Sequence, residues 1–223
     1  MSELKLIAYH GWGYDGSVWQ NWRDWFAALG YGFEAADRGY FGPASGPSWA
    51  GRPIVLVHSY GLHWAMQDWQ QQGFPAIEAL ICFASFQNFH PEAERPRTRS
   101  QKIVQQMIDQ FSLHPAQVLQ SFWGKSAHPD PWPLAPAQTA QLNQALLHQD
   151  LQSLNQAHLD LTPLRAIPNL WVFQGGADRI VAPARGQALA EQLAAAYLEL
   201  PEAGHTLPFT QAETCQAKLK ALL

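Results

Sequence analysis

The chain has 223 residues, of which 47% are hydrophobic and 14% charged, so it can bury the core of one globular domain and is not a disordered protein. Its formal net charge of −4 argues against nucleic-acid binding, and no apolar run is long enough to span a membrane. The first residues contain no apolar stretch of the length found in secretory signals, so we expect a soluble protein of the cytoplasm.

Short, continuous apolar runs alternate with amphipathic helical patterns along most of the chain. Continuous apolar runs are typical of parallel strands that are covered on both faces. The order therefore predicts an α/β fold, in which a mostly parallel sheet is flanked by helices. The predicted strands are residues 4–9, 33–36, 54–57, 77–84, 170–173 and 197–200, and the predicted helices that accompany them are residues 17–29, 62–71, 184–195 and 209–223.

Residues 86–163 interrupt this alternation, because they contain three helical patterns and no convincing strand. The patterns cover residues 99–111, a helix opened by Pro115, and residues 138–154. We therefore expect a core made of residues 1–85 and 164–223. Residues 86–163 would be inserted in it as an all-helical lid over an active site.

A strand-to-helix turn at residues 57–61 reads Val-His-Ser-Tyr-Gly. A sharp turn of this kind projects the hydroxyl of Ser59 above the edge of the sheet and requires small neighbours such as Gly61. Val57 stands where a glycine is usual. The motif alone therefore does not separate a nucleophile from an ordinary serine that caps the next helix.

Asp178 and His205 follow the last two predicted strands. Each alone is also compatible with a turn aspartate or a solvated loop histidine. With Ser59, however, they have the chain order of the α/β-hydrolase triad, and all three fall at the carboxyl edge of the predicted sheet. The combination predicts Ser59 as nucleophile, His205 as general base and Asp178 as the carboxylate that orients the histidine.

A second motif, His10-Gly-Trp-Gly, follows the first predicted strand. Acyl transfer places negative charge on the carbonyl oxygen, and two backbone N–H groups must stabilise it. The residue after the nucleophile supplies one of them, here Tyr60, and we expect Trp12 to supply the other. A tight turn supplied with glycines is the alternative interpretation of this loop.

These motifs resemble those of α/β-hydrolases, and in particular those of the pimeloyl-[acyl-carrier protein] methyl ester esterases of biotin synthesis. The resemblance extends over essentially the whole chain. It implies the α/β-hydrolase fold, no cofactor, and hydrolysis of a carrier-bound pimeloyl methyl ester through an acyl-enzyme. The motifs that carry it are His10-Gly-Trp-Gly with Val18-Trp19, Asp37-Arg-Gly-Tyr-Phe-Gly, Gly175-Gly-Ala-Asp178 and Ala203-Gly-His-Thr-Leu-Pro-Phe209.

The resemblance also implies how the acyl chain is bound. In the family an aromatic residue on the second lid helix faces the acyl chain, and Phe122 matches that position. We expect Trp12, Phe86 and Phe89 to line the same pocket. Burial in the core is the alternative for Phe86 and Phe89.

The chain departs from the family in two further places. The segment between Asp37 and Ser59 is too short for the usual helix and linker, so one face of the sheet should be less covered. The second lid helix also lacks the family's carrier-binding arginines. Basic residues gather instead near the start of the first lid helix, and we expect them to contact the acidic acyl carrier protein. These residues are Arg95, Arg97, Arg99 and Lys102, and a solvated helix start beside Glu92 and Glu94 is the alternative.

No metal is expected, because no pair of the nine histidines has a spacing such as His-Glu-x-x-His. Cys82 and Cys215 are too few for a disulfide framework. The sequence thus predicts a monomeric serine carboxylesterase that acts on a small acyl ester, without nucleic acid or membrane as partner. Two alternatives stay open: another ester or thioester hydrolase or a lyase on the same fold, and a binding protein that has lost catalysis.

Overall fold

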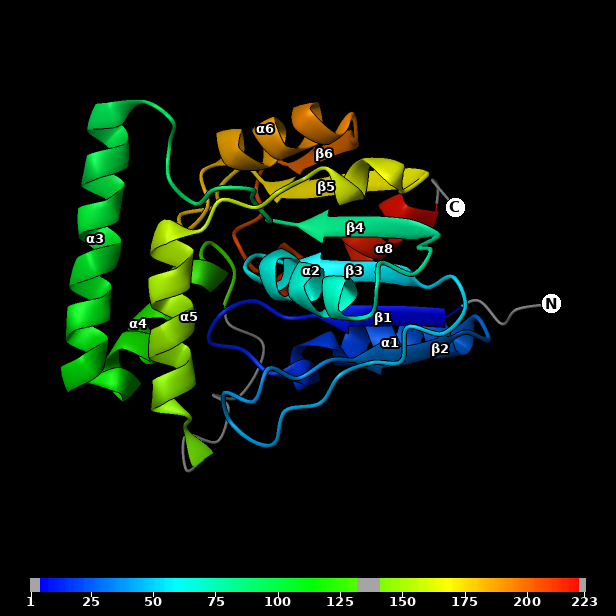
Figure 1. Ribbon diagram of the computed structural model, residues 1–223, viewed down its shortest axis with the longest axis horizontal. Helices are drawn as coiled ribbons and strands as arrows, with labels where there is room; N and C mark the ends of the chain where they lie inside the picture. The colour runs from blue at the N-terminus through cyan, green and yellow to red at the C-terminus, as the bar shows by residue number, and fades with distance from the viewer. Residues whose placement is uncertain (1–4, 132–140, 221–223) are drawn as a thin grey trace.

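The structure is a computed structural model that describes residues 5–131 and 141–220. Its centre is a sheet of six parallel strands in the order β2-β1-β3-β4-β5-β6. Helices lie in front of and behind this sheet (Figure 1), so the predicted α/β fold is confirmed. The strands are β1 (Lys5–Tyr9), β2 (Gly32–Ala35), β3 (Ile54–His58), β4 (Ala79–Phe83), β5 (Asn169–Gly175) and β6 (Ala196–Leu200).

The central strands are apolar on both faces, as the parallel arrangement requires. All five residues of β3 and all five of β4 are buried, and their sequences are Ile-Val-Leu-Val-His and Ala-Leu-Ile-Cys-Phe. A sheet with one wet face would show alternating polar residues instead. The edge strands β2 and β6 are mostly half-buried or exposed.

The faces of the sheet are covered by α1 (Gln20–Ala28), α2 (Gly61–Gln71), α6 (Pro183–Leu193) and α8 (Ala212–Lys220). Figure 1 shows α2 in front of the sheet and α1 and α8 behind it, and α6 packs on β5 and β6. A short 3-10 helix, η1 (Gly16–Trp19), precedes α1 within the range predicted as one helix. The segment between β2 and β3 contains no helix, as its length led us to expect.

The prediction of one helix over residues 209–223 is wrong. The chain forms two helices there, α7 (Leu207–Thr210) and α8, and the helix breaks at Gln211. Gln211 has a non-helical φ of −121°, and its side-chain amide donates to the carboxylate of Asp130. Residues 221–223 of that prediction lie outside the described residues.

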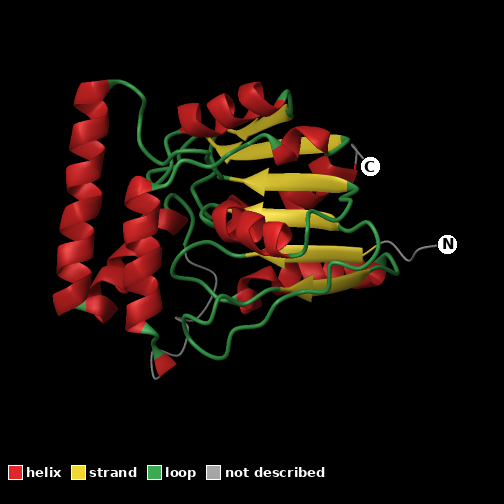
Figure 2. Ribbon diagram, in the orientation of Figure 1, coloured by secondary structure: helices red, strands yellow, loops and turns green. Residues whose placement is uncertain are grey.

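Between β4 and β5 the chain forms α3 (Glu94–Leu113), α4 (Pro115–Ala127) and α5 (Gln144–Gln156), followed by a 3-10 helix, η3 (Pro163–Ala166). We call residues 86–163 the helical insertion. α3 begins earlier than predicted, and residues 138–140 of the third predicted helix lie outside the described part of the chain. Figure 2 shows α3, α4 and α5 together at the end of the sheet to which the strand arrows point, which is its carboxyl edge.

Candidate active site

The strand order reverses between β1 and β3, because β2 continues from β1 on one side and β3 lies on the other. The loops that follow β1 and β3 therefore separate at the carboxyl edge, where open α/β sheets bind their ligands. The loop after β1 contains Trp12, and the turn after β3 contains Ser59. The helical insertion lies over this edge (Figure 2).

The turn at Ser59 has the geometry of a strained elbow. Ser59 has a φ of 55°, in the left-handed region that residues other than glycine rarely adopt. Gly61 permits the close approach of α2 to β1, because a Cβ there would lie 2.5 Å from the carbonyl oxygen of Tyr9. Val57 lies two residues before Ser59. It lies within β3, fully buried, in register with Tyr9 and Cys82.

The structure brings Ser59, Asp178 and His205 together, although they lie far apart in the sequence. The Nε2 atom of His205 lies 3.0 Å from the Oγ atom of Ser59, and its Nδ1 atom lies 2.9 Å from Oδ2 of Asp178. All three residues are buried. With the proton on Nδ1, the imidazole donates to the carboxylate and its Nε2 accepts from the serine hydroxyl, which is the arrangement that nucleophilic catalysis requires.

Asp178 is held in place by further hydrogen bonds. Its Oδ1 atom accepts the backbone N–H groups of Ile180 and Val181 at 2.8 and 2.9 Å. Its Oδ2 atom accepts the side-chain amide of Gln174 at 3.0 Å, in addition to His205. The carboxylate is therefore fixed by four donors and can in turn fix the imidazole ring.

Two backbone N–H groups beside Ser59 have no acceptor in the part of the chain that the structure describes. Trp12 and Tyr60 are buried, yet within the described ranges the structure gives neither backbone N–H an acceptor. The loop of Trp12 lies against the nucleophile, since a Cβ on Gly11 would lie 3.1 Å from the Cβ of Ser59. Buried N–H groups without an acceptor are rare in proteins. These two are suitably placed to receive the negative oxygen of a reacting carbonyl.

The loop of Trp12 is fixed by His10. The backbone N–H of Arg38 donates to Nε2 of His10 at 3.0 Å, so the ring carries its proton on Nδ1 and donates it to the carbonyl of Gly11 at 2.9 Å. Burial lowers the pKa of His10, which keeps the ring neutral. His10 therefore holds the peptide group between Gly11 and Trp12 in one orientation.

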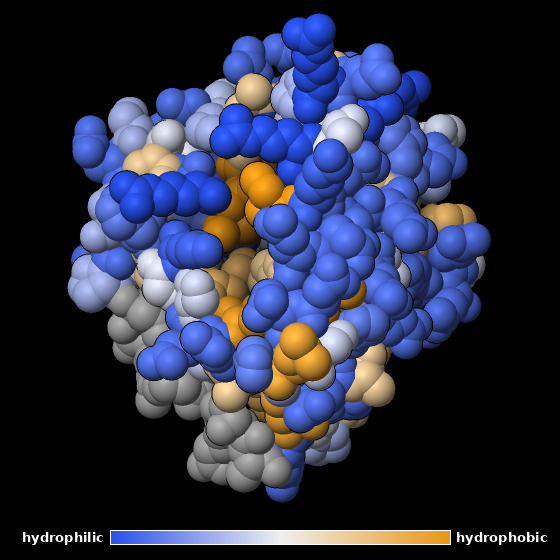
Figure 3. Space-filling model, turned by 90° about the vertical axis from the view of Figure 1, so that its left-hand side faces the viewer, coloured by the Kyte–Doolittle hydropathy of each residue, from blue (hydrophilic) through white to orange (hydrophobic). Residues whose placement is uncertain are grey.

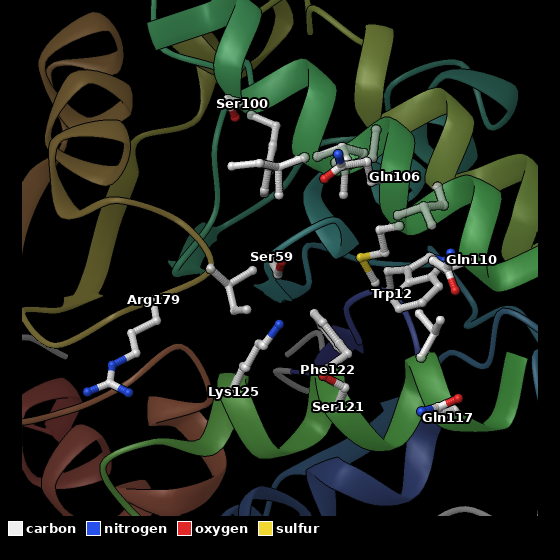
Figure 4. Close-up of a pocket in the computed structure, with 18 of the residues that line it drawn as sticks. Trp12, Ser59, Ser100, Gln106, Gln110, Gln117, Ser121, Phe122, Lys125 and Arg179 are labelled. Carbon is white, nitrogen blue, oxygen red and sulfur yellow. The ribbon is translucent and has the colours of Figure 1, made fainter. Parts of the chain in front are cut away.

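The cavity in front of Ser59 has a volume of about 620 Å³ and is enclosed by α3, α4 and α5 of the helical insertion. Figure 3, which looks onto the helical insertion, shows a hollow with hydrophobic residues inside a hydrophilic rim. Figure 4 shows Trp12 and Phe122 beside Ser59 in this cavity. Its apolar wall is formed by Trp12, Phe89, Ile103, Val104, Met107, Val118, Phe122, Leu151, Leu154 and Ile180.

Phe122 and Phe89 thus line the cavity, as the sequence predicted, but Phe86 does not. Phe86 is fully buried beneath the site, with its ring against those of His63 and Phe89. Its carbonyl accepts the Nε2–H of His63 at 3.0 Å. The prediction of Phe86 as a substrate-binding residue is therefore wrong, because the turn after β4 directs its ring into the core.

Three of the four basic residues assigned to the carrier protein share a surface groove. Arg95, Arg99 and Lys102 line it along α3, and two residues farther along α3, Ile103 and Gln106, line both this groove and the main cavity. Arg97 is not part of the groove, because its guanidinium group donates to the carbonyls of Pro91 and Glu92 in the loop before α3. Its predicted contact with the carrier protein stays a prediction.

Sequence reasoning missed a buried charged residue in the helical insertion, Asp150 of α5. Its carboxylate accepts two hydrogen bonds of 2.8 Å from Arg38 and one of 2.6 Å from the hydroxyl of Tyr40. The hydroxyl of Tyr60, the residue after Ser59, lies 3.5 Å away. The hydrogen bonds to the Asp150 carboxylate raise the pKa of Arg38. The sequence did contain a signal of this burial, because Asp150 lies on the same helical face as the apolar Leu147 and Leu154.

Sequence reasoning also missed two cationic residues in the cavity, Lys125 and Arg179. Arg179 directly follows Asp178, but nothing in its sequence context marks it as a cavity residue. Several apolar cavity residues were also missed, because a helical pattern does not distinguish the wall of a cavity from the core. They are Val104, Met107, Leu151 and Leu154.

Other titratable residues have structural environments. Burial raises the pKa of the Cys215 thiol to about 12 and raises that of Cys82 further, so neither is a thiolate. Within residues 5–131 and 141–220, no group of three or more His, Cys, Asp or Glu side chains is placed to hold a metal ion. No helix in these ranges is both long and apolar enough to cross a membrane.

The parallel sheet, the position of Ser59 at its strand-order reversal and the inserted helices define the α/β-hydrolase fold, and solved structures share it along the whole chain. An esterase from Exiguobacterium antarcticum matches with a TM-score of 0.82 and 15% identity, over 98% of this chain and 91% of its own. A bromoperoxidase from Bacillus anthracis matches with a TM-score of 0.72 and 16% identity, over 99% and 91%. A thermophilic esterase from Thermogutta terrifontis matches with a TM-score of 0.69 and 17% identity, over 98% and 89%. No model of a known protein family matches the chain, and no curated protein is significantly similar to it in sequence.

Proposed function

We propose that this protein is a serine carboxylic ester hydrolase that acts through an acyl-enzyme. The observation that carries the proposal is the hydrogen-bonded chain from Ser59 through His205 to Asp178 beside two unpartnered backbone N–H groups. Esterases among the structural neighbours are consistent with it. A hydrophobic cavity that opens at Ser59 suits an acyl chain.

In the first half-reaction, His205 takes the proton of Ser59 as the hydroxyl oxygen attacks the ester carbonyl. The backbone N–H groups of Trp12 and Tyr60 stabilise the oxyanion that forms. Asp178 stabilises the imidazolium and keeps its Nε2 directed at the reacting atoms. His205 then donates its proton to the alcohol, which leaves as the acyl-enzyme forms.

In the second half-reaction, His205 removes a proton from a water molecule, which attacks the acyl-enzyme. The same two N–H groups stabilise the second oxyanion, and His205 returns the proton to Ser59 as the carboxylic acid is released.

The substrate that the sequence resemblance implies is more specific: the methyl ester of a pimeloyl chain held on acyl carrier protein. We propose it as the first physiological candidate. Phe122 and Phe89 lie in the cavity wall, and this supports a substrate with an acyl chain of several carbons. The groove of Arg95, Arg99 and Lys102 adjoins the cavity and supports an acidic carrier by charge complementarity.

The test is a comparison of esters with the wild-type protein and Ser59→Ala. Methyl pimeloyl-carrier protein is compared with methyl esters of the free acids and with p-nitrophenyl esters of increasing acyl length. Turnover that disappears in Ser59→Ala supports the serine mechanism. The carrier assignment is tested with a triple variant, Arg95→Ala, Arg99→Ala, Lys102→Ala. It is supported if this variant hydrolyses the carrier-bound ester more slowly but the free methyl ester at an unchanged rate. Turnover of free esters alone contradicts the carrier assignment, and no turnover of any ester contradicts the whole proposal.

A further inference from the structure

The cavity in front of Ser59 has a cationic side that the proposed reaction does not use. Lys125 and Arg179 both line the cavity. Figure 4 shows the side chain of Lys125 directed from α4 toward Ser59, whereas Arg179 lies farther from Ser59 with its guanidinium group turned outward. Within the described ranges neither side chain makes a hydrogen bond or an ion pair.

No acidic side chain neutralises these two charges at the cavity wall. None of the described lining residues is an aspartate or a glutamate. Asp178 precedes Arg179 in the sequence, but its carboxylate binds two backbone N–H groups, Gln174 and His205 and forms no ion pair with Arg179. The two cations therefore create a positive potential in a cavity whose walls are otherwise apolar or neutral.

The cationic side is also the side of His205. The last turn of α4, which contains Lys125, is joined to the loop of His205, because the carbonyl of Ser126 accepts the backbone N–H of Thr206 at 3.2 Å. Arg179 is adjacent to the carboxylate that binds His205. In the proposed mechanism His205 gives its proton to the leaving alcohol, so the alcohol half of the ester must face this side. The acyl half of the ester would then contact the apolar wall near Trp12 and Phe122.

We propose that Lys125 and Arg179 form an anion-binding subsite for the alcohol half of the substrate, which carries a carboxylate, phosphate or sulfate group. Both side chains form charge-assisted hydrogen bonds with such oxygens. The inference rests on the proposed ester hydrolysis and narrows its substrate class. It differs from the methyl ester that the family resemblance implies, because a methyl group carries no charge that could pair with Lys125 or Arg179.

The test compares two esters that differ only in charge, 4-carboxyphenyl butanoate and its neutral analogue 4-carbamoylphenyl butanoate. The measured quantity is the ratio of their kcat/KM values in the wild type, Lys125→Met, Arg179→Met and the double variant. Each enzyme acts on the same two esters, so differences in their intrinsic reactivity cancel when ratios are compared. Lys218→Met on α8 is the control, because it removes the same charge from an exposed position on the far side of the sheet.

We expect the ratio to fall by about two- to fivefold in Lys125→Met and further in the double variant, as the loss of a charge pair at an exposed site predicts. The neutral ester should keep its turnover, and added salt should reduce the wild-type ratio. An unchanged ratio in the double variant, or an equal loss for both esters, overturns the subsite while leaving the esterase intact. If the wild type hydrolyses neither these nor other esters, the proposed function fails and the subsite fails with it.

Discussion

The indole N–H of Trp12 donates a hydrogen bond of 2.8 Å to the backbone carbonyl of Leu147 in α5. A second indole, that of Trp123 in α4, donates a hydrogen bond of 2.8 Å to the backbone carbonyl of Gly13, the residue after Trp12. The loop that supplies one proposed oxyanion donor is thus bonded to two helices of the helical insertion. The position of these helices and the geometry of the oxyanion site are therefore coupled.

The first prediction concerns that coupling. Trp123→Phe leaves the buried carbonyl of Gly13 without a donor, so we expect a loss of about 1–2 kcal/mol in the free energy of unfolding. The Trp12 loop should also lose its fixed position, which lowers kcat several-fold with a smaller change in KM. Trp69→Phe is the control, because Trp69 donates a similar bond of 2.7 Å to Pro75 away from the site. Equal kcat values in the two variants would contradict the coupling.

The second prediction concerns the buried carboxylate of Asp150. Asp150→Asn removes the charge that faces Arg38, whose side chain is only 22% exposed. We expect a loss of about 2–3 kcal/mol in the free energy of unfolding, below the range for fully buried pairs. Glu78→Gln is the control, because its ion pair with Arg52 is on the surface and should contribute less than about 1 kcal/mol. Similar losses from denaturant titrations of both variants would show that the Asp150 network is not important for stability.

The third prediction compares the effects of alanine substitutions at two glycines, Gly61 and Gly124. Gly61→Ala places a methyl group 2.5 Å from the backbone oxygen of Tyr9, so α2 must move away from β1 and the Ser59 turn with it. We expect loss of both stability and ester turnover. Gly124→Ala in α4 meets no atom within 4 Å and should stabilise the protein by up to about 1 kcal/mol, because alanine favours the helix. Full activity in Gly61→Ala would be inconsistent with the close approach described above.

The fourth prediction concerns pH and stability. Burial lowers the pKa of His63 from 6.5 to about 4, so between these values the unfolded chain binds a proton that the folded chain does not. The free energy of unfolding should therefore fall as the pH falls from 6.5 to 4, by up to about 3 kcal/mol from this residue. Burial lowers the pKa values of His10 and His58 as well, and they act in the same direction.

The check is the unfolding midpoint measured across this pH window in the wild type and in His63→Gln, which keeps a donor for the carbonyl of Phe86. The variant should lose less stability on acidification. An identical slope in the two proteins would show that the pKa of His63 is the same in the folded and the unfolded chain.

The sequence predicts much of the fold because the signals are local. The central strands are continuous apolar runs, and the structure places Ser59, Asp178 and His205 together because all three end up at one edge of a parallel sheet. Strand order and chain order were enough to select these three among the many polar residues. The chemical role assigned to them stays a proposal until it is measured.

The details that sequence did not predict depend on side-chain direction. Phe86 and Phe89 are three residues apart in one loop without periodicity, yet the first lies in the core and the second lines the cavity. Arg97 stands within the basic cluster but its donors are bound to the preceding loop. The burial of Asp150 is explained by its hydrogen bonds to Arg38, which is distant in the sequence. Such pairings arise from tertiary packing, which local patterns do not contain.

The most direct test of the central claim is the intact mass of the protein after reaction with a fluorophosphonate. We predict one phosphonyl adduct on the wild type, located by peptide mapping at Ser59, none on Ser59→Ala, and much slower labelling of His205→Gln. An adduct at another residue, or equal labelling of the wild type and Ser59→Ala, would contradict the assignment of Ser59 as an activated nucleophile.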